Sequence, residues 1–82
     1  MTALLTLDQA RLNQTFHVAS VTAPEWAPEW AQWLADIGFL PGERVTVLMR
    51  AQPGNDPLAV RVGHSTFALR QAEAACIVVT PA

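Results

Sequence analysis

Three side chains of this 82-residue chain are of the types that carry out nucleophilic or metal chemistry, and each stands alone. Cys76 would be the nucleophile of a thiol enzyme, while His17 and His64 would be ligands of a transition metal. Cys76 lies in the apolar run 74–79, where a thiol is usually a small, inert hydrophobic group with a raised pKa. Neither histidine has a cysteine or a carboxylate at the close spacing of a zinc motif. The sequence around these three residues therefore indicates neither a catalytic cysteine nor a metal-binding motif.

The carboxylates are as scattered as the thiol and the imidazoles. Acid–base catalysis needs carboxylates that converge in a pocket. The seven acidic residues instead fall mostly at expected turns and helix ends, and they are Asp8, Glu25, Glu29, Asp36, Glu43, Asp56 and Glu73. Glu29 suits the positive end of a helix dipole, and the Asp56 carboxylate can accept backbone N–H groups in a turn. The four glycines lack the spacing of a phosphate-binding loop. The sequence predicts a protein that is not an enzyme and needs no cofactor.

Three tryptophans within eight positions are the most informative feature of the chain. Trp26, Trp30 and Trp33 follow i, i+4 and i+7 spacing, which places them near one stripe of a helix. In a core this small, we expect one or two rings to pack inward and the rest to stay at the rim, where aromatic side chains often anchor protein contacts. Partner binding through this stripe and plain packing both remain open at this point.

Composition excludes several classes of partner. Five arginines, no lysine and seven acidic residues give a formal charge of −2, which is too little positive charge for a nucleic-acid surface. The arginines are scattered, so no basic run indicates a membrane tether. A single cysteine is compatible with a reducing cytoplasm, and no apolar run approaches the ~20 residues of a membrane span. We expect one domain, residues 1–82, in the cytoplasm and not inserted in a membrane.

The elements that must position these residues are mostly strands. We expect strands over 15–21, 43–50, 58–62, 65–69 and 76–80, from β-branched and alternating apolar residues. In the strand 43–50, Val45, Val47 and Met49 form the apolar face. In the strand 15–21 the inward set is Phe16 and Val18, with Ser20 next in the alternation. Five strands in so short a chain favour a small closed or partly closed barrel.

Helices are expected in three places. The periodicity predicts the main helix from Glu29 onward, after a proline-rich loop and before Gly38, which can supply a left-handed end. A brief helical turn is predicted within 4–12, with Thr6 able to cap it, and another over 70–75. Tight turns are expected over 39–42, where proline precedes glycine, and over 53–57.

Three of these segments together resemble the FeoA family of small proteins associated with bacterial ferrous iron transport. Residues 34–42 resemble its Leu-x-x-Leu/Met-Gly-hydrophobic-x-Pro-Gly helix and turn, 54–62 its Gly-Asp-Pro hairpin with Asn55 inserted, and 67–74 its Leu-Arg-x-x-Glu-Ala closing segment. With a weaker match over 7–13, the resemblance covers almost the whole chain. The structural motif residues are Gly38, Pro41, Gly42, Pro57, Leu69 and Arg70.

Two segments depart from the family pattern. Asn13 stands where the family often has glycine, and asparagine can replace glycine in a left-handed turn. The stretch from Trp26 to Trp33 departs from a segment that usually carries an arginine near Leu34, so a contact made there would be particular to this protein.

The resemblance implies a mainly β fold with short helices, namely a small SH3-like β-barrel of about five strands with one helix inserted after the first strand. It also implies a cytoplasmic accessory role, peripheral at the inner membrane through its partner, the FeoB-type GTPase permease. The predicted partner-binding residues are Trp26, Trp30, Trp33, Pro53, Asn55 and Asp56. A metal-responsive domain using His17 and His64, and weak self-association through exposed tryptophan, are the alternatives.

Overall fold

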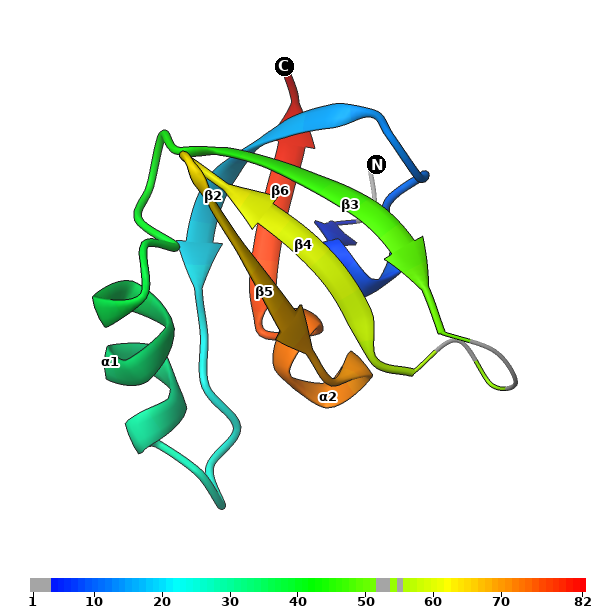
Figure 1. The fold of residues 1–82 in the computed structure, drawn as a ribbon. Coiled ribbons are helices and arrows are strands. Elements are labelled where there is room, and N and C mark those ends of the chain that lie inside the picture. Colours follow the sequence, from blue (N-terminus) through cyan, green and yellow to red (C-terminus); the bar gives the residue numbers. More distant parts are fainter. Residues whose placement is uncertain (1–3, 52–53, 55) are drawn as a thin grey trace.

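Residues 4–51, 54 and 56–82 are described by the computed structural model, and within them six strands form one antiparallel sheet. The strand order is β1-β6-β2-β3-β4-β5, and the sheet curls so that β3, β4 and β5 lie across from β6 (Figure 1). The elements in chain order are β1 (Leu5–Thr6), η1 (Leu7–Gln9), β2 (Thr15–Val21), α1 (Glu29–Asp36), β3 (Arg44–Arg50), β4 (Leu58–Val62), β5 (Ser65–Leu69), α2 (Gln71–Ala74) and β6 (Ile77–Pro81). The mainly β prediction is confirmed. The structure has one strand more than the five that were predicted, and this additional strand is the two-residue β1, which pairs with β6.

Strand β2 covers the residues predicted for it, but its inward face changes partway along. Phe16 and Val18 are buried, as expected. The pairing of β2 with β6 then shifts register between Val18 and Ser20, and such a bulge moves the following side chains to the opposite face. Val21 therefore packs against the core and Ser20 is exposed, so the alternation predicted for this end of the strand was wrong.

Strand β3 has a similar irregularity at its far end. Val45 and Val47 are fully buried, but the pairing with β4 shifts register between Val47 and Met49. Met49 is 60% exposed, which corrects the prediction that it faces the core. Beyond the bulge, the guanidinium of Arg50 donates hydrogen bonds to the backbone carbonyls of Asp8 and Ala10. Arg50 therefore holds the η1 segment against the end of β3.

Helix α1 runs from Glu29 to Asp36 and ends where glycine was expected to end it. Gly38 has a φ of +119°, and the N–H of Phe39 donates to the carbonyl of Leu34 over 3.0 Å, which closes the C-terminal turn. Both Leu34 and Phe39 are fully buried. The helix therefore rests on the barrel through Leu34 and returns the chain to the core at Phe39.

Two left-handed residues shape the remaining turns. Gly42 has a φ of +91°, and the N–H of Glu43 donates to the carbonyl of Leu40 over 3.0 Å, which confirms the predicted turn before β3. Asn13 has a φ of +63° and donates its N–H to Val47, which agrees with its place at a position where glycine is common. Near it, the predicted helical turn is a single 3-10 turn, and the Thr6 hydroxyl donates to the Asp8 carboxylate rather than capping a backbone N–H.

The core lies inside the curled sheet and receives side chains from every strand from β2 to β6. No polar or charged residue is buried among those the structure describes. Its largest fully buried side chains are Phe39, Leu7, Leu34, Leu58, Leu69, Ile77, Val45, Val47 and Val60. Because this one cluster includes Leu34 of α1 and Ala74 of α2, it holds both helices against the same barrel.

Candidate partner-binding surface

The three tryptophans take three different positions around α1. Trp26 lies in the turn before the helix and is 72% exposed, whereas Trp30 is half-buried and packs against the core. Their ring centroids are 4.9 Å apart at an interplanar angle of 75°, an edge-to-face pair. Trp33 is 39% exposed and projects from the next turn of the helix. One ring therefore packs inward and two remain available at the surface.

The segment that carries these rings has an excess of negative charge. Between residues 22 and 43 the chain has four of its seven acidic residues and none of its five arginines. The acidic residues are Glu25, Glu29, Asp36 and Glu43, and all four are exposed. The Asp36 carboxylate accepts a hydrogen bond from the Gln32 side chain over 2.7 Å, and none of the four forms an ion pair within the described part of the chain. The surface around α1 is therefore both aromatic and anionic.

The second predicted contact region has a structural role in the described residues. The Asp56 carboxylate accepts the backbone N–H of Gln71 over 3.0 Å, at the first residue of α2. The N–H of Arg70 in turn donates to the Glu73 carboxylate over 2.7 Å. These bonds satisfy backbone donors at the start of a helix, which otherwise lack a partner. Asp56 thus joins the segment before β4 to the segment after β5.

The predicted contact residues do not gather on one surface. Figure 1 shows α1 on one side of the barrel and the start of β4, next to Asp56, on the other. Asp56, Pro57 and Arg70 line a shallow, open hollow there. Pro53 and Asn55 were also predicted to bind a partner, and they lie outside the described residues. The tryptophan surface and the Asp56 hollow are therefore two separate regions.

The family motif residues form two connections rather than a contact surface. Gly38, Pro41 and Gly42 carry the chain from α1 into β3. Pro57 precedes β4, and Leu69, opposite Leu58 in the register of β4 and β5, is fully buried next to Arg70. Each set therefore places one helix against the sheet.

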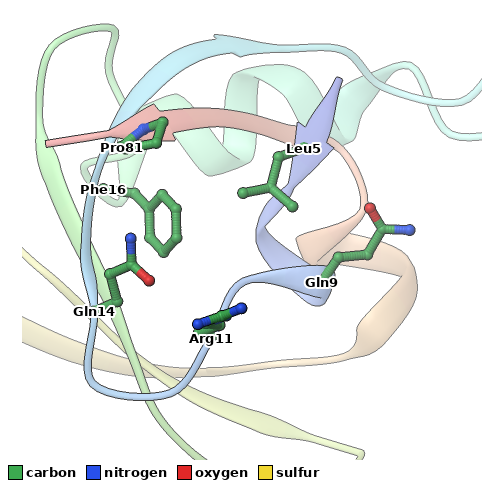
Figure 2. A pocket seen from close by; sticks show the side chains of 6 residues that line it. All are labelled: Leu5, Gln9, Arg11, Gln14, Phe16 and Pro81. Carbon is green, nitrogen blue, oxygen red and sulfur yellow. The ribbon is translucent and has the colours of Figure 1, made fainter. Parts of the chain in front are cut away.

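A second hollow lies where η1, β2 and the end of β6 meet, and it was not predicted from the sequence. Figure 2 shows Gln9, Arg11 and Gln14 around a floor that includes Phe16. Such donors above an apolar floor could receive an anionic group, although all three polar side chains are exposed. Five of the six lining residues lie within 5–16, and Pro81 at the end of β6 completes the hollow through the pairing of β6 with β2. The window 5–16 alone does not show that these side chains surround one hollow.

The thiol and the imidazoles occupy positions that suit packing better than chemistry. Cys76 is buried, and burial, together with the negative charges of Glu73 and Asp8, raises the pKa of its thiol. His17 of β2 is paired with Arg44 of β3. The Arg44 carbonyl also accepts the N–H of Gly63, the residue before His64. Strand β3, with the Arg44 cation, therefore lies between the two histidines. In the described ranges, no three His, Cys, Asp or Glu side chains could hold a metal ion together.

A family model of the FeoA domain matches residues 5–81, which include every strand and helix described above. The chain belongs to the FeoA family. FeoA-family proteins are non-enzymatic accessory proteins, and membership confirms the prediction that this chain is not an enzyme. No sequence among curated proteins gave a significant match.

Solved structures show the same FeoA fold. A Stenotrophomonas maltophilia FeoA, crystallised with zinc and described as a procaryotic SH3 domain protein, is 36% identical with a TM-score of 0.84, over 93% of this chain and 89% of that one. A Chlorobium tepidum FeoA is 27% identical with a TM-score of 0.79, over 94% and 70%. A manganese-dependent transcriptional repressor, 23% identical with a TM-score of 0.81, shares the fold over all of this chain and 44% of its own. The SH3-like prediction is confirmed.

In the portion of the chain that the structure covers, no helix is long and apolar enough to cross a bilayer. Among the same residues, the exposed large aromatic side chains are Trp26, in the turn before α1, and Trp33 within the helix.

Proposed function

We propose that this protein is a single-domain accessory factor of bacterial ferrous iron uptake, which acts by binding the cytoplasmic side of a FeoB-type GTPase permease. The observation that carries the proposal is the match of the FeoA domain over residues 5–81, nearly the whole chain. The Stenotrophomonas maltophilia FeoA has itself been suggested to act as a bacterial ferrous iron transport activating factor, which supports the same role here.

The site chemistry supports binding rather than catalysis as the mode of action. Exposed tryptophans such as Trp26 and Trp33 are typical anchors of protein interfaces, because they bury much apolar area at a small entropic cost. A rigid β-barrel that presents such a helix could bias the conformation of a partner simply by binding one state more tightly than another. The partner-binding residues of this proposal are Trp26, Trp30 and Trp33, with the loop that contains Asp56 as a second region.

The test is a binding and turnover experiment with the purified FeoB-type permease of the same bacterium in detergent. We expect saturable binding of this protein to the immobilised permease and a changed rate of GTP hydrolysis at saturation. An unrelated protein of similar size and net charge is the control. If the chain neither binds saturably nor alters GTP hydrolysis, the proposed function is wrong.

A further inference from the structure

One exposed face of α1 alternates carboxylate, indole and carboxylate. Glu29, Trp33 and Asp36 occupy positions i, i+4 and i+7, so their side chains lie one above the other along the helix. Neighbours at these spacings have Cβ atoms about 5–6 Å apart, which places a carboxylate next to the indole on both sides. All three side chains are exposed. We call these three residues the acid–indole stripe.

No residue of the acid–indole stripe belongs to the hydrophobic core cluster of the described residues. Leu34 is the residue of α1 that is fully buried, and Trp30 is the ring that packs against the core and against Trp26. Trp33 takes part in no ring pair in the described part of the chain. The Gln32 amide fixes one oxygen of Asp36, which leaves the carboxylate oriented but still charged. An indole held between two charges in this way is free to bind something else.

The charge of the stripe decides what that partner is. Because residues 22–43 contain acidic residues and no basic ones, nucleic acid and anionic lipid headgroups are repelled. A second copy of this chain would bring the same negative face, so self-association through the stripe is disfavoured. A cation is attracted both by the two carboxylates and by the face of an indole, which is the best aromatic partner for ammonium and guanidinium groups.

We propose that Glu29, Trp33 and Asp36 bind an arginine or lysine side chain of a basic segment on the partner protein. The cation lies over the Trp33 ring, within about 6 Å of its centroid, and the two carboxylates flank it. This inference rests on the proposed function, because it names the chemistry of the permease surface that the protein recognises. Trp26 and Trp30 contribute apolar contact beside the stripe.

The first test compares matched variants in the permease-binding experiment. We expect Glu29→Gln, Asp36→Asn and Trp33→Leu each to weaken binding by roughly three- to tenfold, since each removes one part of the cation site. Glu43→Gln is the matched control, because it removes the same charge from the acidic segment 22–43 at an exposed residue outside the stripe, and we expect it to weaken binding less than Glu29→Gln or Asp36→Asn. Raising the salt concentration should weaken binding of the wild type much more than binding of the variant that carries both Glu29→Gln and Asp36→Asn. Equal affinity and equal salt dependence in all proteins would overturn the inference and leave the proposed function standing.

A second test does not need the permease. A tetra-arginine peptide is titrated into the isotopically labelled protein, and the indole N–H resonances are followed by NMR. We expect the Trp33 resonance to shift in a saturable way, with a much smaller shift at Trp26 and loss of the effect in the Glu29→Gln/Asp36→Asn variant. If the wild type binds no permease but shows this response, only the proposed function fails. If the Trp33 resonance does not respond, or responds equally in the variant, the cation site is disproved.

Discussion

At the scale of single residues, Asp56 shows how a short family motif acts on a distant part of the chain. Its carboxylate accepts the N–H of Gln71, fifteen positions later, and the adjoining Arg70 N–H is accepted by Glu73. The Gly-Asp-Pro and Leu-Arg-x-x-Glu-Ala segments therefore form one structural unit that starts α2. Proximity to a turn in the sequence indicated that Asp56 would bind backbone amides, but it could not indicate which ones, because the acceptor and the donor meet only when β4 pairs with β5.

This role of Asp56 gives a stability prediction. Replacing a helix-capping aspartate by alanine costs about 0.5–2 kcal/mol, so we expect Asp56→Ala to lower the free energy of unfolding by about 1 kcal/mol. Asp56→Asn keeps an acceptor oxygen and should lose only part of that amount. Urea unfolding followed by circular dichroism measures both, with the exposed Glu25→Ala as the control. An Asp56→Ala protein as stable as the control would show that the cap is not formed in solution.

At the scale of elements, the parts of the fold with a local cause were predictable. The strand 15–21 with its alternation up to Val18, the apolar period after Glu29 and the Pro41-Gly42 turn are each determined by neighbouring residues, and each is found in the structure. The register shifts in β2 and β3 were not predictable, because a bulge depends on how a strand meets its partner. Met49 was misplaced for this reason.

The candidate site also has a part that was predictable from local sequence and a part that was not. The sequence correctly predicted that some of the tryptophans stay at the surface. The single helical stripe was wrong, because Trp26 lies in the turn before α1 and only Trp30 and Trp33 are on the helix. Most of the lining of the hollow around Arg11 lies within residues 5–16, but Pro81 joins it only through the pairing of β6 with β2, which the sequence does not show. The contact between Asp56 and the start of α2 could not be predicted either, because it depends on how distant segments pack together.

The turn between α1 and β3 tests the conformational reason for a glycine. Gly42 has a φ of +91°, and a Cβ added there would meet nothing within 4 Å, so substitution costs backbone strain and not a steric clash. We expect Gly42→Ala to reduce the free energy of unfolding by about 1–2 kcal/mol. Asparagine tolerates positive φ better, and Gly42→Asn should lose less. Urea unfolding of the two variants side by side checks the order, and an equal loss in both would contradict this explanation.

At the scale of the whole molecule, the core anchors and the proposed binding residues lie on different faces of one helix. The inward face of α1 is anchored by Leu34, with Trp30 and Ile37 partly buried beside it. The outward face carries Trp33 between two carboxylates, and the arginines all lie outside residues 22–43. An electrostatic difference of this kind between parts of a small protein orients its approach to a charged partner and makes the association rate depend on salt. The barrel therefore serves as a rigid support for a helix whose outer surface is free to vary.

This separation predicts opposite behaviour for two adjacent residues. Leu34 is fully buried, and a leucine-to-alanine change in a core costs about 2–5 kcal/mol, a large part of the 5–15 kcal/mol typical of a whole domain. We expect Leu34→Ala to unfold at a much lower urea concentration, whereas Trp33→Ala should cost clearly less free energy of unfolding, because the Trp33 side chain is 39% exposed and lies outside the core cluster. Circular dichroism measures unfolding without depending on the tryptophan signal. A similar large loss in both variants would mean that Trp33 supports the fold, and its ring would then not be free to receive a cation.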